Sequence, residues 1–432
     1  MYIYFQTFGC KVNQYETAAV AALFDRDRFT VTDDPCLCDV CIINSCSVTA
    51  ESVSKMRQFL RRMRRLCPDA VIAVTGCAPQ GEPDISLPEA DIVTGTKNRA
   101  ALPALVDSFL SDRRNVTDIS PYNGSEIFEP LRCAADKGHT RAFLKIQDGC
   151  NRFCSYCIIP YTRGRIRSKS PDMLRDDVSA LSSAGYSEIV LTGINLGFYG
   201  REYGISITDA VNICAEAENI QRIRLGSLEP ELLSDTVLEK LAAQPKLCPS
   251  FHLSLQSGCE KTLRSMNRKY TPDEYRHTVE RVRDMFPECS VTTDIMTGFP
   301  GETEEDFEES AAFAESIGFS DIHVFPYSVR KGTKAALMPC QVDGGEKHRR
   351  AAVISQIAKK SREKFLDSQL GKTFPVLFER EKPDGSCGGY TPNYTFIKIL
   401  TKNSKKHLRN LVFYVTIDKI EENMCYGSFA DI

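Results

Sequence analysis

Short apolar runs alternate with amphipathic stretches along the first quarter of the chain. The runs have the length and β-branched content of buried strands, and the stretches between them repeat apolar residues every three or four positions. We predict strands at 2–7, 39–44, 70–75 and 91–94, and helices at 14–23, 50–66 and 98–110. This alternation favours a parallel sheet with helices on its faces.

A second alternating series occupies the middle of the chain. Strands are predicted at 142–147, 188–192, 222–226, 251–255, 291–296 and 321–325. Helices are predicted at 171–184, 207–217, 230–243, 272–285 and 303–317. These strand–helix units fit a partial (β/α)6 barrel, whose active site is expected at the carboxyl ends of the strands.

The alternation of strands and helices predicts an α/β protein. Its changes along the chain divide the sequence into three domains. We predict an N-terminal parallel α/β domain at 1–112 and a linker at 113–138, where Pro, Gly, Asn and Asp interrupt any period. The partial barrel follows at 139–368 and closes with a charged helix at 346–369. The tail, 369–432, has β-type runs at 373–378, 394–400 and 411–417, which predict a small antiparallel β-barrel.

Composition limits the possible partners and compartments. The formal net charge is −3, so any contact with nucleic acid requires local basic patches. The sequence shows neither a signal-peptide pattern at its start nor an uncharged apolar run long enough for a membrane helix, so we expect a cytoplasmic protein without a membrane partner. In a reducing compartment, 18 cysteines indicate metal binding or catalysis more than disulfides.

Three of the cysteines form a compact motif. Cys150, Cys154 and Cys157 stand just after the first predicted barrel strand, in the segment CNRFCSYCIIP. Thiolates are the usual ligands of iron–sulfur clusters, and three of them leave one iron of a four-iron cluster open. The alternative is a structural zinc site, but zinc prefers four ligands in paired C-x2-C spacing.

Three further cysteines follow successive strands of the N-terminal domain. Cys10, Cys46 and Cys77 stand at turns that share one edge of a parallel sheet, so they are predicted to converge on a second cluster with its own open iron. The alternative is that they pack as small apolar side chains. Cys36 and Cys38 are not expected to join Cys41, because Cys41 lies inside a strand.

The x3-x2 spacing, with Tyr156 before the last cysteine, resembles the radical S-adenosylmethionine family. The resemblance implies that the open iron binds the amino-acid end of S-adenosylmethionine and that Tyr156 lies near its adenine. Further candidate cofactor-binding residues stand at the ends of later barrel strands: Gly193, Asn195, Ser227, Glu229, Gln256 and Asp294. The family commonly has Gly-Glu where this chain has Asn195.

The whole chain resembles the methylthiotransferases. The resemblance rests on TFGCKVNQYE at 7–16, on the Asn-Ser-Cys and Thr-Gly-Cys turns at Cys46 and Cys77, and on the central cysteine loop. It implies a cluster domain, a radical barrel and a C-terminal RNA-binding barrel of the TRAM type. GCKVNQYE is most similar to the subgroup that acts on N6-threonylcarbamoyladenosine at position 37 of tRNA, next to the anticodon.

The resemblance also implies the chemistry, in which a C2–H bond of adenine becomes C–SCH3. One S-adenosylmethionine methylates sulfur bound at the Cys10, Cys46 and Cys77 cluster. Another is cleaved at the Cys150, Cys154 and Cys157 cluster to a 5′-deoxyadenosyl radical, which activates C2. The six cysteines are therefore both metal-ligating and catalytic candidates, and the cofactors are two [4Fe–4S] clusters and S-adenosylmethionine. An external electron donor and a sulfur source complete the partners.

Basic segments provide candidate contacts to tRNA. They lie on the helix after Cys46, on the loop after Cys157 and in the C-terminal barrel, and the candidates are Arg61, Arg62, Arg163, Arg165, Arg167 and Lys398. The helix could equally present a solvated face, and the C-terminal barrel could simply cap its neighbour.

Other functions remain open at this stage. The substrate could be isopentenyladenosine in tRNA or a ribosomal protein residue, and from a different class the chain could be a non-catalytic iron–sulfur protein that binds RNA.

Overall fold

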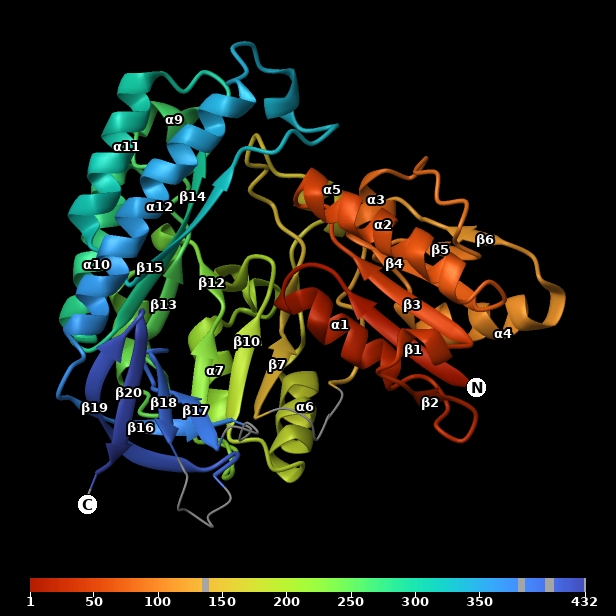
Figure 1. The fold of residues 1–432 in the computed structure, drawn as a ribbon, viewed down its shortest axis with the longest axis horizontal. Helices are drawn as coiled ribbons and strands as arrows, with labels where there is room; N and C mark the ends of the chain where they lie inside the picture. The colour runs from red at the N-terminus through yellow and green to blue at the C-terminus, as the bar shows by residue number, and fades with distance from the viewer. Residues whose placement is uncertain (134–139, 380–384, 401–407, 431–432) are drawn as a thin grey trace.

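A computed structural model describes residues 1–133, 140–379, 385–400 and 408–430 (Figure 1). The N-terminal domain lies on one side, the central barrel beside it, and the small C-terminal barrel under the central one. None of the helices in the described ranges is both long and apolar enough to cross a membrane.

The N-terminal domain is a six-stranded sheet in the order β2-β1-β3-β4-β5-β6, with every pair parallel. Its central strands are buried on both faces, which explains their continuous apolar runs. The strands are β1 (Tyr2–Thr7), β2 (Thr30–Val31), β3 (Val40–Ser45), β4 (Val71–Gly76), β5 (Ile92–Thr94) and β6 (Val116–Asp118). The helices are α1 (Lys11–Ala21), α2 (Ala50–Leu66), α3 (Cys77–Gly81) and α4 (Leu102–Asp112).

The start and the buried face of helix α2 follow from its sequence. Thr49 caps it by accepting a hydrogen bond from the Ser52 amide at 3.1 Å. Apolar residues spaced by three or four face the sheet, while arginines occupy the other side. The predicted bounds of this helix are confirmed.

Residues 113–138 were predicted to be a linker, but their first part contains a strand, β6. Strand β6 pairs with β5 and becomes the outermost strand of the N-terminal sheet. A run of three residues is too short for a period to appear in the sequence, so it was missed. The segment then crosses to the barrel, where Leu131 joins the barrel core.

The central domain contains the predicted strand–helix units, arranged as two parallel sheets, β11-β10-β7 and β12-β13-β14-β15. The predicted strand at 222–226 is followed at once by a second short strand, β12. The strands are β7 (Arg141–Lys145), β10 (Glu188–Thr192), β11 (Arg222–Leu225), β12 (Ser227–Leu228), β13 (Ser250–Leu253), β14 (Ser290–Thr297) and β15 (Asp321–Pro326). A short antiparallel pair, β8 (Gln147–Asp148) and β9 (Arg167–Ser168), lies outside these sheets.

Helices cover the outside of the sheets, and one large apolar core lies between the two layers (Figure 1). The helices of this domain are α6 (Pro171–Ser183), α7 (Ile207–Ala215), α8 (Asp235–Ala242), α9 (Glu260–Ser265), α10 (Pro272–Met285), α11 (Glu304–Ile317) and α12 (Gly344–Asp367). A further short helix, α5 (Ile159–Arg163), lies instead against α3 of the N-terminal domain. The α/β class and the partial barrel are confirmed.

The C-terminal domain is a closed five-stranded barrel in the order β16-β17-β18-β20-β19. Among the described residues, its strand pairs are antiparallel except β18 with β20, which is parallel. The strands are β16 (Thr373–Phe378), β17 (Ser386–Tyr390), β18 (Phe396–Leu400), β19 (Val412–Glu421) and β20 (Met424–Phe429). The sequence did not predict β17 or β20; β17 reads Ser-Cys-Gly-Gly-Tyr, and paired glycines weaken a strand pattern.

This small barrel is held against the central one by arginines. Arg222 donates to the Tyr390 carbonyl at 2.8 Å, and Arg224 donates to the Thr391 and Pro392 carbonyls at 2.7 Å each. Arg141 pairs with Glu379 at 2.9 Å. These contacts come from β7 and β11, so the C-terminal domain covers one end of the central barrel.

Candidate cluster and cofactor site

The three N-terminal cysteines lie at one edge of the sheet. They follow β1, β3 and β4, which are neighbours, and the register places Thr7 beside Asn44 and Asn44 beside Thr75. The turn before Cys10 approaches Cys46 so closely that a Cβ at Gly9 would stand 2.8 Å from the Cys46 Cβ. Gly9 also has a φ of +115°, which favours glycine.

Electrostatics show that these thiols lie close together. Burial raises the pKa of Cys77 to about 12; Arg163 opposes this rise, and Cys46 and Cys10 add to it. Burial likewise raises the pKa of Cys46, and Cys10 contributes to the same shift. The three thiols therefore lie within electrostatic reach of one another at this edge of the sheet, and their joint binding of a cluster stays a prediction.

Polar groups surround this trio. Cys10 donates to Asn13 Oδ1 at 3.2 Å, and Arg163 Nε donates to Cys77 Sγ at 3.3 Å. The Val48 amide donates to Cys46 Sγ at 3.4 Å. The donors directed at the Cys46 and Cys77 sulfurs favour the thiolate, which is the form that binds iron, whereas Cys10 is itself the donor in its bond to Asn13.

The second trio lies on the loop between β8 and α5. The Cys150 amide donates to the Gly164 carbonyl at 3.0 Å, which closes the loop at its base. Asn195 Nδ2 donates to Cys150 Sγ at 3.6 Å, and Arg268 Nη1 donates to Cys154 Sγ at 3.5 Å. Burial raises the pKa of Cys157, and Cys154 and Cys150 raise it further, so these thiols also converge.

The donor set of the barrel loop is three thiols, and thiolates are the usual ligands of iron–sulfur clusters. Within the described residues, no group of three or more His, Cys, Asp or Glu side chains is placed to hold one metal ion. The barrel thiols therefore fit, by their chemistry, a four-iron cluster with one iron left open. A second cluster at Cys10, Cys46 and Cys77 stays a prediction.

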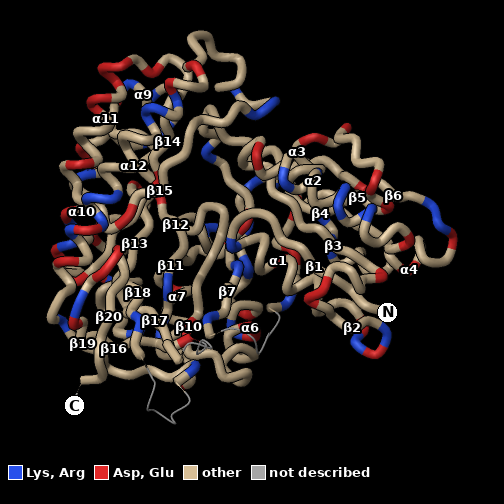
Figure 2. Tube along the Cα trace, in the orientation of Figure 1, with Lys and Arg blue, Asp and Glu red and all other residues tan. Residues whose placement is uncertain are grey.

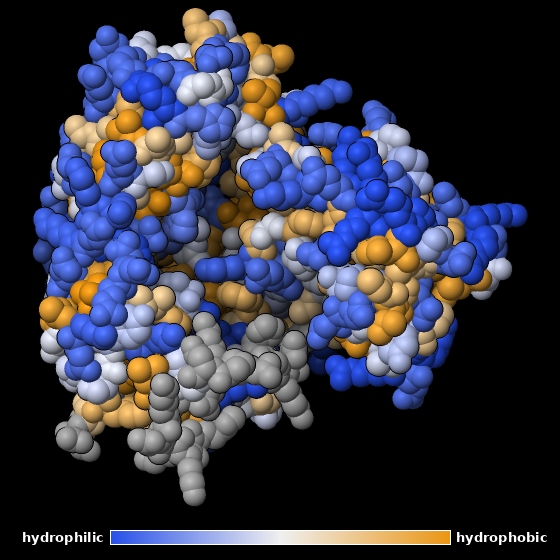
Figure 3. Space-filling view, viewed as in Figure 1, coloured by the Kyte–Doolittle hydropathy of each residue, from blue (hydrophilic) through white to orange (hydrophobic). Residues whose placement is uncertain are grey.

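A cavity of about 410 Å³ lies between the N-terminal domain and the barrel, and three predicted cofactor residues, Tyr156, Gln256 and Asp294, line it together with Cys157. Thr49 contributes the wall on the N-terminal side. Figure 3 shows the molecule hollowed between these two domains, with apolar side chains visible inside. The cavity is therefore bordered by the barrel cluster loop and by the segment that follows Cys46.

Two of the predicted cofactor residues, both buried, leave an oxygen without a hydrogen-bond partner among the described residues. They are Asn195, through Oδ1, and Gln256, through Oε1. Buried polar atoms are nearly always paired, so each oxygen requires a donor from outside the chain. The amino and hydroxyl groups of S-adenosylmethionine are such donors, and the residues present therefore fit this cofactor.

The remaining predicted cofactor residues also stand at the carboxyl ends of the strands. A Cβ at Gly193 would meet the Gln147 Cβ at 2.9 Å, so only glycine allows this approach. Ser227 is exposed on β12 beside His252 of β13. Glu229 accepts a hydrogen bond from Arg268, so its carboxylate already has a partner within the chain.

Arg163 and Arg167 require a correction, since both were predicted to contact RNA. Arg163 is fully buried and Arg167 is 7% exposed. Arg163 donates to both carboxylate oxygens of Glu16, at 2.7 and 3.0 Å, and Arg167 pairs with Asp148 at 3.2 Å. Their charges are neutralised inside the protein, so these two side chains are not available to a phosphate backbone.

Glu16 is a buried residue beside the candidate site that sequence analysis did not single out. It is fully buried and pairs with Arg163, with Arg99 at 3.1 Å and with Lys145 at 2.7 Å. Burial alone would raise the pKa of Glu16, but Arg163, Arg99 and Lys145 hold it well below its usual range. Its partners come from both domains, so this ion network fixes the N-terminal domain against the barrel. The only sequence signal was the position of Glu16 in the motif at 7–16.

Arg268 is a second missed residue. It contacts Cys154 and Glu229 and also donates to the Ser254 carbonyl at 3.2 Å. It stands after α9, away from any cysteine motif, and no local pattern marks it.

The other basic candidates stand at the surface. Arg61 and Arg62 are exposed on α2, where Lys and Arg residues are concentrated (Figure 2). Arg165 is exposed after α5, and Lys398 is half-buried on β18. Their contact with RNA stays a prediction.

A separate thiol group lies under α2. A hydrogen bond from Cys41 lowers the pKa of Cys38 to about 7, burial opposes this shift, and the Cys67 thiol adds a second hydrogen bond. Cys41 therefore does contact Cys38, contrary to the expectation from strand alternation. The cause is that the segment before β3 folds back, so Cys38 is buried in the same apolar cluster as Cys41 and Cys67.

The partial barrel with its three-cysteine loop defines an enzyme of the radical S-adenosylmethionine class. The Radical SAM superfamily matches residues 144–314, and the uncharacterized protein family UPF0004 matches residues 2–95. Among solved structures, the radical S-adenosylmethionine methyltransferase TsrM from Kitasatospora setae aligns with a TM-score of 0.58 at 14% identity, covering 78% of this chain and 77% of that one. That likeness supports the fold.

Curated relatives extend over nearly the whole chain. The threonylcarbamoyladenosine tRNA methylthiotransferase MtaB of Bacillus subtilis is 37% identical over 94% of this chain and 92% of its own length. MtaB of Thermotoga maritima is 34% identical over 90% and 89%. The tRNA-2-methylthio-N(6)-dimethylallyladenosine synthase of Pelotomaculum thermopropionicum is 35% identical over 88% and 87%. The chain belongs to the radical S-adenosylmethionine methylthiotransferase family.

Proposed function

We propose that this enzyme methylthiolates C2 of the adenine in N6-threonylcarbamoyladenosine at position 37 of tRNA. The observation that carries the proposal is the pair of cysteine trios, one from each domain, on either side of one ion network. The relatives support tRNA as the substrate, since those from B. subtilis and P. thermopropionicum are both named for tRNA modification. The same proposal places the enzyme in the cytoplasm and includes external donors of sulfur and of electrons.

The residues of the chain have distinct tasks in this reaction. With clusters and S-adenosylmethionine bound, the site supplies one-electron cleavage of the cofactor and a sulfur atom for transfer. Asn195 and Gln256 orient the cofactor through their free oxygens. Arg163 bonds Cys77 and, through Glu16, fixes the distance between the two trios, which provides the proximity that the transfer requires.

Positive charge around Lys11 favours a substrate that carries a carboxylate. Lys11, next to Cys10, is open to solvent yet lies within electrostatic reach of Arg141 and Arg224. Its ammonium group makes no hydrogen bond or ion pair with the described residues.

The neighbouring arginines, including Arg222, share two carboxylates, Glu188 and Glu379. The groups around Lys11 therefore carry an excess of positive charge, which a threonylcarbamoyl carboxylate would neutralise and an isopentenyl group would not.

Nucleoside analysis tests the proposal. The reconstituted enzyme is incubated anaerobically with S-adenosylmethionine, a reductant, a sulfur source and tRNA bearing threonylcarbamoyladenosine, and the digested nucleosides are separated by liquid chromatography and mass spectrometry. A 2-methylthio product on threonylcarbamoyladenosine is expected. Modification of isopentenyladenosine tRNA alone, or of neither, would overturn the assignment.

A further inference from the structure

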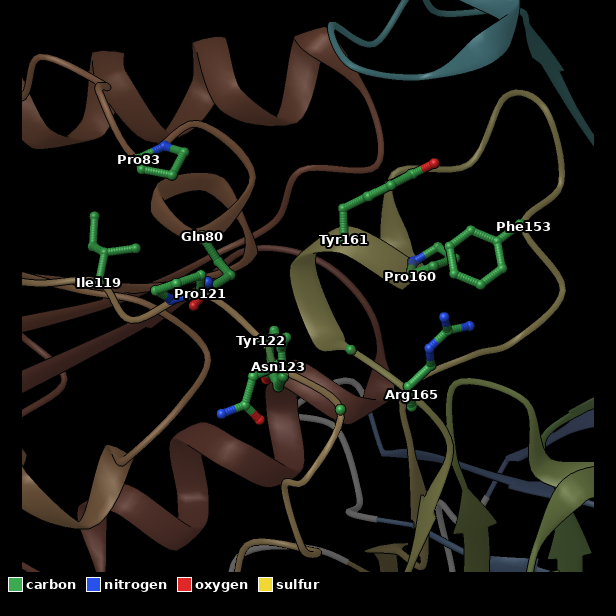
Figure 4. Close-up of a pocket in the computed structure, with 12 residues that line it drawn as sticks. Gln80, Pro83, Ile119, Pro121, Tyr122, Asn123, Phe153, Pro160, Tyr161 and Arg165 are labelled. Atoms are coloured by element: carbon green, nitrogen blue, oxygen red, sulfur yellow. The ribbon is translucent and has the colours of Figure 1, made fainter.

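A second pocket lies on the other side of the barrel cluster loop. It has a volume of about 640 Å³ and is formed by both domains (Figure 4). Phe153, Tyr161 and Arg165 line it from the cluster loop and the residues after it, while Gln80 and Tyr122 line it from the opposite wall. None of the residues assigned above to S-adenosylmethionine belongs to it.

Aromatic rings and one cation are available in this pocket. Tyr161 is 53% exposed, and its ring meets Phe153 edge-on, with centroids 5.7 Å apart. The Arg165 guanidinium stands 4.8 Å from the Phe153 centroid. It makes no hydrogen bond or ion pair within the described ranges, unlike Arg163 and Arg167.

The Phe153 ring is held in place by its backbone. Phe153 has a φ of +51°, a region that residues with side chains seldom occupy. Asn267 Nδ2 donates to its carbonyl at 3.0 Å and to that of Arg152 at 3.3 Å. A strained residue fixed by such contacts often serves binding.

The position of the pocket relates it to the reaction cavity. Tyr156, Cys157 and Ile159 line that cavity, and Pro160 and Tyr161, the next residues along α5, line this pocket. Helix α5 therefore borders both spaces. A strand of unpaired nucleotides with one base in the cavity could place a neighbouring base in the pocket.

We propose that this pocket binds an unpaired nucleotide next to the modified adenosine, with its base stacked on Tyr161 and its phosphate on Arg165. The inference rests on the proposed function, since it requires an RNA substrate. Aromatic rings beside a free arginine are the usual means of holding single-stranded nucleic acid.

Binding of an anticodon stem-loop RNA tests this site. The RNA carries threonylcarbamoyladenosine, and fluorescence anisotropy is recorded over a range of salt concentrations. Tyr161→Leu is expected to weaken binding roughly tenfold, while Tyr161→Phe keeps the ring and stays near the wild-type affinity. Arg165→Gln is expected to weaken binding and to reduce the slope of log K against log salt by about 0.7, and Arg165→Lys to retain that slope.

Matched controls remove the same groups elsewhere. Arg26→Gln and Tyr2→Leu change exposed residues on the N-terminal domain away from its cysteine edge, and they are expected to bind RNA as the wild type does. Iron content per chain is measured for every variant, so that loss of the cluster is not mistaken for loss of an RNA contact.

Some results would overturn the inference. If Tyr161→Leu and Arg165→Gln hold their iron and bind RNA with wild-type affinity, the pocket does not bind RNA. If RNA affinity is unchanged and reduction by the electron donor slows, the pocket belongs to that donor. Either result would leave the proposed function intact, because nucleoside analysis of the wild type judges that separately.

Discussion

The Arg163 guanidinium donates from Nη1 to Oε1 of Glu16 at 2.7 Å and from Nη2 to Oε2 at 3.0 Å, while its Nε donates to Cys77 at 3.3 Å. One side chain from the barrel thus contacts both a motif residue and a candidate cluster ligand of the N-terminal domain. The buried Arg163 guanidinium therefore helps to hold the two domains in their relative position.

Replacing Glu16 by Gln is therefore expected to destabilise the interface between the two domains. The change leaves Arg163, Arg99 and Lys145 short of a buried negative charge, and breaking such a pair costs about 3–5 kcal/mol. Thermal unfolding should show a lower transition temperature. Glu51→Gln, at an exposed residue of α2, is the control and should leave the transition almost unchanged.

The stability of this network should also depend on pH. The pKa of Glu16 is held well below its usual range, so its contribution is fully present above the unfolded value of about 4.3. It is lost as pH falls towards the folded pKa. Wild-type stability should drop more steeply than that of Glu16→Gln between about pH 5 and pH 3. Parallel curves for the two proteins would contradict this account.

The outline of the fold could be predicted because its signals are local. The strand at 2–7 and the helices at 50–66 and 272–285 have the predicted bounds, since each carries its own period and flanking residues. Strand β6 lay hidden in the predicted linker, because a three-residue edge strand is defined by pairing with β5 rather than by its own sequence.

The candidate site was predictable in part for the same reason. The positions of Cys10, Cys46 and Cys77 after successive strands sufficed to predict their convergence. The role of Arg163 could not be predicted, because the sequence around an arginine in a basic loop does not tell whether its side chain faces solvent or a buried carboxylate. Its partner, Glu16, comes from a distant part of the chain.

Iron content should separate the two trios. The wild type is expected to hold about eight irons after anaerobic reconstitution, and a variant with Cys10, Cys46 and Cys77 changed to Ala about four. That variant should still form 5′-deoxyadenosine from S-adenosylmethionine, whereas the corresponding variant of Cys150, Cys154 and Cys157 should not. Four irons in the wild type would contradict a second cluster.

Lys11→Met should remove the preference for a charged substrate. The ammonium group would make a charge-assisted hydrogen bond to the threonylcarbamoyl carboxylate, worth about 1.5–3 kcal/mol. Affinity for an anticodon stem-loop with threonylcarbamoyladenosine should therefore fall at least tenfold. Affinity for the same RNA with unmodified adenosine should stay the same, and an equal loss for both RNAs would show that Lys11 does not recognise the carboxylate.

The basic face of α2 should contribute to RNA affinity through charge alone. Arg61 and Arg62 are exposed, and changing both to Gln should lower the slope of log K against log salt by roughly 1 to 2. Arg26→Gln again provides the control. A slope equal to that of the wild type would mean that this face only contacts solvent.

The arginines that reach from the central barrel to the backbone of Tyr390, Thr391 and Pro392 have a consequence for how the enzyme can be divided. The C-terminal domain covers the amino ends of β7 and β11 and is also a candidate RNA module. Deleting it to measure its share of RNA binding would uncover that end of the central barrel and leave Arg222 and Arg224 without their carbonyl acceptors. Point changes on its outer surface are the way to examine RNA contact while that end of the barrel stays covered.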